Sequence, residues 1–504
     1  MSTKNFMHLE GCTSDGRADM TNFEMDLFDT RMSGYKHLSK EESEECCKNS
    51  IIKPACIPIT IISFFIIMII FFPLFSDDAL ESAKNYEKEK LCKESCKFRF
   101  VESIPVGMKY ENLTNSSTYN AWKQLLSRAQ NSVDLAVLYW NLNETGYNTS
   151  WQGNEIFHLI SNLSSNGVKV RVAQNYPSAQ FPQKESQYLQ EHNLADVRSL
   201  NFAQLYPHTK GSGVLHTKFW IIDDKHVYIG SANMDWKSLT EVKELGVLIE
   251  DCSCLAVDLS KIFAVYWKLG EEEAKIPDKW PISWRTSYNA KDPLDLTLNN
   301  NISSGIYISS SPKEFNPKGR EHDLDAIINV METANEFIHI SVMDYIPSTL
   351  YYSKNSNFFW PKLDDAIRAA AYRGVQVQML ISHWEHSKKE MIPFLKSLLE
   401  INGAIKGKIQ VKLFTVPKGQ EDIPFSRVNH AKYMVTENTA YVGTSNWAGD
   451  YFIRTAGVGV IVKAVNDRVV IEQLQNIFNR DWNSPYASSE LDYYLWNAKF
   501  EKVE

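Results

Sequence analysis

The chain has no excess of positive charge, which limits the partners that it can hold by charge alone. Its 504 residues include 53 lysines and arginines against 61 aspartates and glutamates, so the formal net charge is −8. A broad basic surface normally supplies non-specific affinity for nucleic acid, and its absence argues against a protein that coats duplexes. A short pocket that grips one phosphate needs no such surface and remains compatible with this composition.

The spacings typical of metal ligands are missing as well. The eight cysteines are Cys12, Cys46, Cys47, Cys56, Cys92, Cys96, Cys252 and Cys254. Cys252 and Cys254 lie too close together for the common Cys-x2-Cys zinc knuckle, so we expect an activity that needs no metal or other cofactor. The last four cysteines could instead form two disulfides in an oxidising compartment, and the sequence leaves the three possible pairings open.

What the chain does contain is one arrangement of polar residues that occurs twice. The first copy holds His216, Lys218, Asp223, Ser231 and Asn233, and the second holds His430, Lys432, Glu437, Ser445 and Asn446. In each copy a histidine and a lysine stand two residues apart, a carboxylate follows the lysine by five residues, and a turn of small residues ends in asparagine. A single His-x-Lys pair on a half-buried strand means little, but two complete copies favour a catalytic site.

These residue types suit the cleavage of a phosphodiester through a covalent intermediate. Alternation along an extended strand places the histidine and the lysine of each copy on one face. A neutral histidine can attack phosphorus while a second, protonated histidine donates to the leaving oxygen. The lysines would stabilise negative charge on the remaining oxygens, with the serines and asparagines as hydrogen-bond donors. Asp223 and Glu437 would orient the imidazole rings, as the carboxylate of a catalytic triad does.

Similarity between the two parts of the chain extends beyond these motifs. Residues 129–137 resemble residues 334–342 at an offset of 205, and the offset grows slowly to 215 near the end of each part. Each part alternates amphipathic helices with β-branched runs, which predicts an α/β fold with helices on both faces of a mostly parallel or mixed sheet. We expect two duplicated α/β sandwich domains that form a pseudo-twofold pair, over residues 98–290 and 291–504, with their connection inside residues 275–301.

The apolar periodicity predicts individual helices and strands. The elements predicted in the second part are helices over residues 323–335 and 363–372 and strands over residues 337–343 and 375–381. Around the first motif, His216 and Lys218 are predicted to lie in one β-strand with residues 219–222. The predicted pair of domains would bring both motifs to one shared face, where a single phosphate could be gripped from two sides.

A long apolar run lies near the beginning of the chain. Residues 56–75 contain eight isoleucines, five phenylalanines and no charged residue, which is long enough to cross a bilayer. Lys48 and Lys53 precede the run and acidic residues follow it, so the excess of positive charge on the N-terminal side predicts a signal anchor with a cytosolic N-terminus. The expected organisation is a cytosolic tail over residues 1–55, a transmembrane anchor over residues 56–76 and a luminal stalk over residues 77–97.

Glycosylation sequons agree with this topology. All six lie after the apolar run, at Asn112, Asn115, Asn143, Asn148, Asn162 and Asn301. Any single sequon means little, because the pattern is common by chance. Their one-sided distribution nevertheless agrees with a catalytic region in the lumen.

The paired motifs make the chain resemble the phospholipase D superfamily. The strings GSANMDWKSLT (230–240), PFSRVNHAKYMVTE (424–437) and GTSNW (443–447) make it similar, more narrowly, to the animal type II membrane members that are lysosomal 5′-to-3′ exonucleases on single-stranded DNA and RNA. The resemblance runs from about residue 98 to residue 486. An inactive branch of this subgroup has lost motif histidines, whereas this chain keeps both, so the resemblance implies an active phosphodiesterase.

The resemblance also implies roles for the motif residues. By analogy with the superfamily, His216 is the nucleophile and His430 is the acid–base, although the near symmetry of the two copies leaves the reverse assignment open. Glutamate at position 437 departs from the superfamily at large and is typical of the subgroup.

Other implied features concern the region beyond the anchor. The subgroup implies disulfides between Cys92 and Cys254 and between Cys96 and Cys252. It also implies a homodimer that passes through the endoplasmic reticulum and the Golgi to the late endosome and lysosome. A pair of histidines that exchanges protons suits an acidic lumen, where one imidazolium is readily supplied.

Two further functions fit the same motifs. A phospholipid phosphodiesterase or transphosphatidylase would pass the same phosphohistidine to water or to a lipid hydroxyl, and a membrane-anchored regulatory protein with an inactive site would cleave nothing. For a nucleic-acid substrate, aromatic residues near the motif strands could stack bases, although core packing explains each of them more simply. These residues are Trp140, Tyr345, Trp447, Tyr451 and Phe452, and Arg427 could contact a flanking phosphate.

Overall fold

The computed structural model of the chain describes residues 61–67, 92–111, 113, 115–207, 213–351 and 357–491. Residues 61–67 are helical, and they belong to a different unit of the chain from the described residues 92–491. Within the described residues, no helix combines the length and the apolarity that crossing a membrane requires. The predicted tail and most of the predicted anchor and stalk lie outside the described residues, so these stay predictions.

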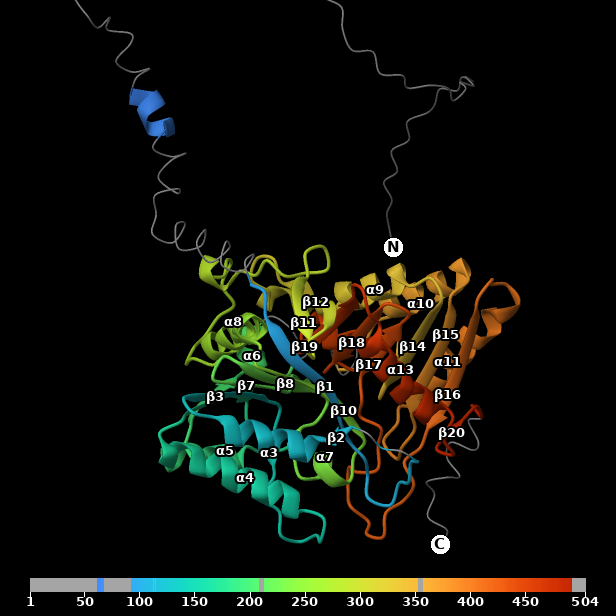
Figure 1. Cartoon of the computed structure of the whole chain (residues 1–504), viewed down its shortest axis with the longest axis horizontal. Coiled ribbons are helices and arrows are strands. Elements are labelled where there is room, and N and C mark those ends of the chain that lie inside the picture. Colours follow the sequence, from blue (N-terminus) through green and yellow to red (C-terminus); the bar gives the residue numbers. More distant parts are fainter. Residues whose placement is uncertain are drawn as a thin grey trace, which may run out of the picture. The chain divides into compact units, whose positions relative to one another are not determined.

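The first part of the larger unit forms a mixed sheet with the strand order β2-β1-β10-β8-β7-β3-β5-β6. Figure 1 labels all of these strands except β5 and β6. Its strands are β1 (Ser95–Ser103), β2 (Ser116–Ser117), β3 (Ser132–Val137), β5 (Lys169–Asn175), β6 (Asp196–Leu200), β7 (Phe219–Ile222), β8 (His226–Gly230) and β10 (Glu244–Glu250). Neighbours are antiparallel from β1 through β10, β8 and β7 to β3, and β3, β5 and β6 are parallel. Five of the six residues of β3 are buried, because helices cover both faces of the sheet.

The second part forms a sheet with the order β11-β12-β19-β18-β17-β14-β15-β16-β20. Its strands are β11 (Leu294–Leu298), β12 (Ile302–Ser311), β14 (Phe337–Val342), β15 (Gln376–Ser382), β16 (Lys408–Phe414), β17 (Tyr433–Thr436), β18 (Thr439–Gly443), β19 (Gly457–Ala464) and β20 (Ala487–Ser488), with the short β13 (Glu321–His322) beside β12. Ser95 and Cys96 of β1 pair with β11 and join the two sheets. β4 (Trp140–Asn141) and β9 (Met234–Asp235) form a separate two-stranded sheet.

Helices cover these sheets on both sides. They are α3 (Thr118–Arg128), α4 (Trp151–Leu163), α5 (Lys184–Glu191), α6 (Phe202–Leu205), α7 (Lys237–Thr240), α8 (Ser253–Leu269), α9 (Asp323–Thr333), α10 (Lys362–Arg373), α11 (Met391–Glu400), α12 (Asp450–Ile453) and α13 (Val469–Trp482), with 3-10 turns η1 (Ser164–Asn166), η2 (Ile282–Trp284), η3 (Lys313–Phe315) and η4 (Ile401–Gly403). In the first sheet, Trp122 of α3 stacks on Trp220 with ring centroids 4.5 Å apart. The neighbouring Phe219 points to the other face and meets Tyr266 of α8 at 6.1 Å, as alternation along a strand requires.

The second sheet is covered in the same way. Phe478 of α13 contacts Tyr433 at 6.5 Å between ring centroids, while Asp323 at the start of α9 accepts a hydrogen bond from Tyr441. Tyr433 pairs with Val442 in the ladder, so Tyr433 and Tyr441 point to opposite faces. The α/β fold with helices on both faces of mixed sheets is confirmed.

The strand order of the first sheet recurs in the second. The series β1-β10-β8-β7-β3-β5-β6 corresponds, strand for strand, to β12-β19-β18-β17-β14-β15-β16. Gly230 pairs with Gly246 in one sheet and Gly443 with Gly459 in the other, so equivalent positions in these two pairs of strands differ by 213 in number. We call residues 95–269 the first half and residues 294–482 the second half.

Most of the predicted elements of the second half agree with the structure. The two helices predicted there are α9 and α10, and the two strands are β14 and β15, each shifted by at most two residues at either end. The predicted connection over residues 275–301 contains η2 and β11, so it is partly ordered into the second sheet. Around the first motif, β7 begins only at Phe219, and His216 and Lys218 lie in the segment before it.

Two disulfides tie the beginning of β1 to the start of α8. Cys92 bonds to Cys254, and Cys96 bonds to Cys252, which confirms the pairing implied by the family resemblance. The two bridges are nested, because each closes a loop that spans nearly the whole first half, with sequence separations of 162 and 156. Once one bridge is formed, the other closes only a short additional loop.

This nesting predicts unequal effects of removing one bridge or both. From loop-closure entropy, we expect Cys92→Ser with Cys254→Ser to cost roughly 2–3 kcal/mol of unfolding free energy, and removal of both bridges to cost roughly 7–8 kcal/mol. Guanidinium unfolding of the purified protein, followed by tryptophan fluorescence, measures both. A variant without bridges that loses no more than twice the single-bridge loss would contradict the nested arrangement.

Candidate active site

Two backbone bridges between the halves position the motif histidines. The residue before each histidine forms a parallel β-bridge with the other half, Leu215 with Ala456 and Asn429 with Lys243. The N–H of His216 donates to the carbonyl of Ala456 at 2.9 Å, and the N–H of His430 donates to the carbonyl of Lys243 at 2.8 Å. Each histidine is therefore held by the half that it does not belong to.

The bridges bring the two imidazoles to one place. Their ring centroids lie 6.5 Å apart with the planes at 68°, and both rings line one pocket of about 420 Å³. Asn233 and Asn446, the asparagines that end the two motif turns, line the same pocket. The predicted convergence of the two motifs on one site is thus present in the structure.

His216 is held in the form that a nucleophile requires. Its Nδ1 lies 2.9 Å from the carbonyl oxygen of Thr444, and a carbonyl only accepts, so Nδ1 carries the proton and Nε2 keeps its lone pair. Burial lowers the pKa of His216 well below its usual value, and the charges of Lys218 and Lys432 lower it further. The ring is therefore neutral over the physiological pH range.

His430 has a different partner, which the sequence did not reveal. Its Nδ1 lies 2.9 Å from Oε2 and 3.1 Å from Oε1 of Glu244, a buried residue at the start of β10 in the first half. Burial lowers the pKa of His430 to about 4, while the charge of Glu244 acts in the opposite direction. Burial acts to raise the pKa of Glu244, but the charge and the hydrogen bond of His430 lower it by more. The pKa of Glu244 is therefore lowered overall, and the carboxylate stays ionised.

Only one of the two histidines has a carboxylate partner because the halves differ at one position. Glu244 in the first half is equivalent to Gly457 in the second, since both begin the strand that pairs with the motif hairpin. A Cβ at Gly457 would lie 2.2 Å from Oγ of Ser445, so a larger residue does not fit there. His216 consequently meets a neutral carbonyl where His430 meets a charge.

The two motif lysines are buried beside the histidines. Each ammonium donates to the carbonyl of the histidine two residues before it, Lys218 to His216 and Lys432 to His430. Burial lowers the pKa of Lys432 to about 7, and burial together with the charge of Lys432 lowers the pKa of Lys218 well below its usual value. A phosphate bound near these ammonium groups would favour their charged forms.

The role predicted for the motif carboxylates is wrong. Asp223 accepts hydrogen bonds from the backbone N–H groups of residues 130–132 at 2.7–2.8 Å. Glu437 likewise accepts from the backbone of residues 335–337, with the shortest contact 2.7 Å to Asn335. Both follow their motif strand and cap the beginning of the neighbouring strand, and neither orients an imidazole.

The serines and asparagines of the motif turns differ in what they can reach. Ser231 is fully buried and exchanges hydrogen bonds with the backbone of Leu245. It also helps to lower the pKa of Glu244, so it acts on the site through that carboxylate. Ser445 is also fully buried and does not line the pocket. Asn446 does line it, and its amide donates to Asp344 at 3.0 Å.

Asp344 is a second site residue that the sequence did not reveal. It follows β14, lines the pocket and is 5% exposed. Burial raises its pKa to about 6, against the opposing charges of Lys432 and Lys388. No local pattern distinguishes this aspartate from other acidic residues that follow strands.

Most aromatic residues proposed for base stacking belong to the core. Trp140, Tyr345, Trp447 and Phe452 are each at most 3% exposed, and of the proposed set only Tyr451 lines the pocket. Arg427 also has a structural role, since it binds Glu241 at 3.1 Å and donates to two backbone carbonyls. Other aromatic residues line the pocket, among them Tyr139, Phe181 and Trp384.

A family model described as "PLD3/4, PLD-like domain" matches residues 111–419. The chain is 52% identical to a probable phospholipase D of Caenorhabditis elegans over 94% of this chain and 88% of that protein. It is 44% identical to the 5′-3′ exonuclease PLD3 of Xenopus tropicalis, over 86% and 88% of the two chains, and 45% identical to human 5′-3′ exonuclease PLD3, over 80% and 82%.

The chain belongs to the phospholipase D superfamily. Within it, the chain is a PLD3-like protein, and it is a phosphodiesterase of the hydrolase class. The family model ends before the second motif, and the two motifs meet only in the folded protein.

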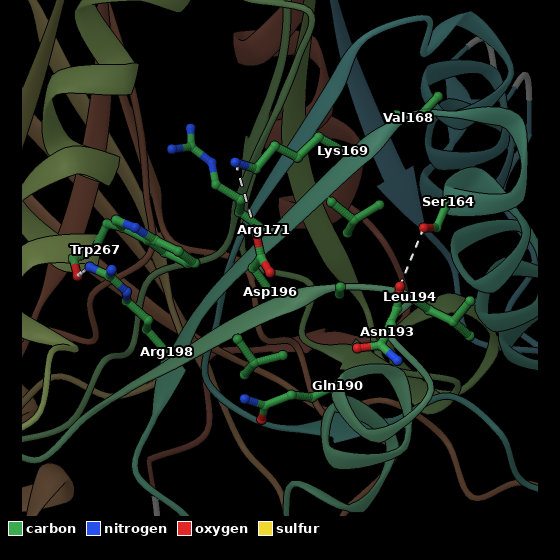
Figure 2. A pocket seen from close by; sticks show the side chains of 13 residues that line it. Ser164, Val168, Lys169, Arg171, Gln190, Asn193, Leu194, Asp196, Arg198 and Trp267 are labelled. Carbon is green, nitrogen blue, oxygen red and sulfur yellow. Dashed lines mark hydrogen bonds and ion pairs between the residues drawn. The ribbon is translucent and has the colours of Figure 1, made fainter.

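A second pocket of this phosphodiesterase is lined by paired charges. It has a volume of about 650 Å³ and lies against β5, β6 and α8. Figure 2 shows Arg198 against the indole of Trp267 and Lys169 near Asp196. Arg198 also pairs with Glu271, and Arg171 with Asp134, so acidic side chains neutralise the cations that line this pocket.

The remaining predicted sites lie at the surface or near the disulfides. Of the six sequons, Asn143, Asn148, Asn162 and Asn301 are exposed, and Asn112 lies outside the described residues. Asn115 is half-buried and donates its amide to Glu102 at 2.7 Å, a bond that a glycan on that nitrogen would break. In the part of the chain that the structure describes, the groups close enough to hold a metal contain Cys92, Cys96, Cys252 and Cys254 with Glu94, and these cysteines are oxidised to disulfides.

The Glu244–His430 pair leads to a prediction about pH. Because Glu244 raises the pKa of His430, Glu244→Gln makes the protonated imidazole rarer at any given pH. We expect kcat/KM on a phosphodiester to fall by roughly 10²- to 10⁴-fold, and its decline with rising pH to move to lower pH. A matched control is Glu250→Gln, which removes a buried carboxylate on the same strand that pairs with Arg99 and Arg128. A pH profile of Glu244→Gln that coincides with that of the control would contradict this role.

Proposed function

We propose that the chain is an acid phosphodiesterase that works as a 5′-3′ exonuclease on single-stranded DNA and RNA through a phosphohistidine on His216. The observation that carries the proposal is the pair of buried imidazoles, 6.5 Å apart in one pocket, each hydrogen-bonded through Nδ1 so that Nε2 is left for the substrate. The substrate class follows from the PLD3 relatives that are named 5′-3′ exonucleases.

The first step forms the covalent intermediate. The lone pair on Nε2 of His216 attacks phosphorus, a nitrogen–phosphorus bond forms, and the bond from phosphorus to the leaving ester oxygen breaks. His430, protonated on Nε2, gives its proton to that oxygen. The bond from Nδ1 of His430 to Glu244 stabilises the imidazolium before transfer, which favours His430 as the acid.

The second step returns the enzyme to its starting state. His430, now neutral at Nε2, takes a proton from water as the water oxygen attacks phosphorus. The nitrogen–phosphorus bond breaks, the phosphate monoester leaves, and His216 is regenerated neutral. The Thr444 carbonyl holds the His216 ring at Nδ1 throughout both steps.

The electrostatics of the pocket supports an anionic substrate. Lys218 and Lys432 are buried, and this burial is the main reason why their pKa values are lowered. A phosphodiester bound in the pocket adds a negative charge, which favours the charged form of both lysines and of His430. The lysines then stabilise the charge that develops on the non-bridging oxygens. An acidic chain can bind phosphate in this way because the two motif lysines are buried next to the motif histidines.

We further propose that the two halves arose by duplication and sit in the lumen behind an N-terminal anchor. The repeated strand order and the two equivalent bridges support the duplication. The disulfides and the exposed sequons support passage through the endoplasmic reticulum and Golgi, toward late endosomes and lysosomes. A homodimer and the type II orientation complete this proposal.

The topology has a direct test. If the region beyond the anchor is luminal, protein from cells will shift to lower mass with peptide N-glycosidase, in steps that Asn→Gln changes at the four exposed sequons abolish. Asn115→Gln should leave the pattern unchanged, because that amide is engaged with Glu102. A protein that carries no glycan at any of the four positions would contradict luminal placement.

The activity is tested with an end-labelled single-stranded oligonucleotide at pH 5 and pH 7. We expect stepwise shortening from the 5′ end that persists in EDTA, because the proposed steps use histidines and lysines and no metal. His216→Ala and His430→Ala should each lose at least roughly 10³-fold in rate, and rapid quenching should trap phosphate on His216. A phospholipid substrate is run in parallel: turnover of the lipid alone would favour a lipid phosphodiesterase, and phosphate recovered on His430 would reverse the histidine roles.

A further inference from the structure

Aromatic rings continue from the catalytic pocket to the protein surface in one connected series. Trp384, in the loop after β15, lines the pocket beside His430. Its ring meets that of His386 edge-on, with centroids 4.8 Å apart and planes at 86°. His386 then stacks on Phe425, from the loop before β17, at 4.6 Å and 24°. We call Trp384, His386 and Phe425 the aromatic track.

Phe425, at the outer end of the aromatic track, is exposed to solvent and has a strained backbone conformation. Phe425 is 65% exposed, and its backbone has a φ of +55°, a left-handed conformation that bulky residues rarely adopt. Burial of a phenyl ring is normally favourable, so this arrangement sacrifices stability at this position. Strained, exposed residues of this kind occur preferentially where a ligand binds.

The loop that carries Phe425 is braced rather than loose. Arg427 donates to the carbonyl of Pro417 at 2.7 Å and binds Glu241 of the first half at 3.1 Å. Lys237, also from the first half, donates to the carbonyl of Pro424 at 3.3 Å. The ring is therefore held at a defined distance from the pocket by contacts across the two halves.

Charge and hydrogen-bonding capacity accompany the aromatic rings. Lys388, in the same loop as Trp384 and His386, lies with Nζ 5.8 Å from the ring centroid of Tyr351, which lines the pocket. The positive charge of Lys388 lowers the pKa of Asp344, against the effect of burial. Lys388 forms no ion pair with the described residues. The buried indole N–H of Trp384 has no hydrogen-bond partner among the described residues either.

We propose that the aromatic track stacks the bases of the strand that leads away from the scissile phosphate, and that Lys388 contacts the phosphate of that strand. An exposed aromatic ring, that of Phe425, together with a lysine that forms no ion pair with the described residues, is what single-stranded nucleic acid requires, because every base has a π-face and every linkage a charge. This inference rests on the proposed nuclease function. It explains how an acidic protein holds a strand without a basic surface: stacking contributes most of the affinity outside the pocket.

The test pairs a protein variant with a substrate variant. Phe425→Asn removes the ring, and asparagine tolerates the left-handed backbone, so the loop should keep its conformation. The substrates are single-stranded oligonucleotides that carry one abasic site at successive positions from the cleaved end. In the wild-type full chain, an abasic site at the stacked position should lower kcat/KM by about 5- to 150-fold, the effect of losing one stacked base.

The supporting result is loss of that penalty in the variant. Phe425→Asn should cleave the intact strand with a kcat/KM about 5- to 150-fold lower than that of the wild type, mainly because KM rises. The abasic site that lowers kcat/KM in the wild type should not lower it further in this variant. Phe425→Trp should restore both the rate and the penalty. Tyr372→Ala, which removes a 56%-exposed aromatic ring on α10 away from the pocket, serves as the control and should behave as wild type.

Other outcomes overturn the proposal. If Phe425→Asn keeps the abasic penalty of the wild type, the ring does not stack a base. If its strand cleavage is unchanged while its binding to phosphatidylcholine vesicles falls, the exposed ring contacts lipid. If the wild type itself cleaves no oligonucleotide, the proposed nuclease function fails, which is distinguishable because it does not depend on the variant.

Discussion

The hydrogen bonds that each motif histidine makes to the opposite half are the constraint on which the site depends. His430 donates to the carbonyl of Lys243, whose ammonium is itself fully buried and paired with Asp481 at 2.7 Å. Glu102 and Arg480 extend this buried ion-pair network. Removing one member of such a network leaves an uncompensated buried charge, so the network resists any shift of the strand end next to Glu244. The catalytic geometry is therefore a property of the interface between the halves, and neither half contains it alone.

One broken symmetry at this interface gives similar residues different chemistry. The bridges, the lysines and the motif turns repeat in both halves, but Glu244 corresponds to Gly457. An ionised carboxylate stabilises a positive charge on His430, whereas the carbonyl at His216 fixes a tautomer without favouring protonation. The two imidazoles share one pocket and both are buried, so a single buried charge is enough to give them different tendencies to bind a proton.

The parts of this arrangement that could be predicted are those encoded in local patterns. α9, α10, β14 and β15 agree with the apolar periodicity of their segments, and the repeated motifs indicated that two histidines and two lysines would meet. The roles of Asp223 and Glu437 could not be predicted. Their spacing after the lysines suits a catalytic triad, but both residues lie in turns after a strand, where they accept hydrogen bonds from backbone N–H groups. Core packing, the simpler explanation for the aromatic residues near the motifs, holds for Trp140, Tyr345, Trp447 and Phe452; proximity to a motif in sequence does not say which side of a buried strand a ring occupies.

By itself, the amino-acid sequence determined the α/β class, the chemistry of the paired motifs and the cysteines available for two bridges, since each depends on residue type and short-range spacing. Only the tertiary structure decided that Glu244 and Thr444 hold the imidazoles and that Asp344 faces the pocket, because each of these contacts joins residues from different strands or from different halves. Contacts between segments more than a hundred residues apart leave no periodic signal in the chain. They are set by how the strands of two sheets are paired and by which buried charges that pairing brings together.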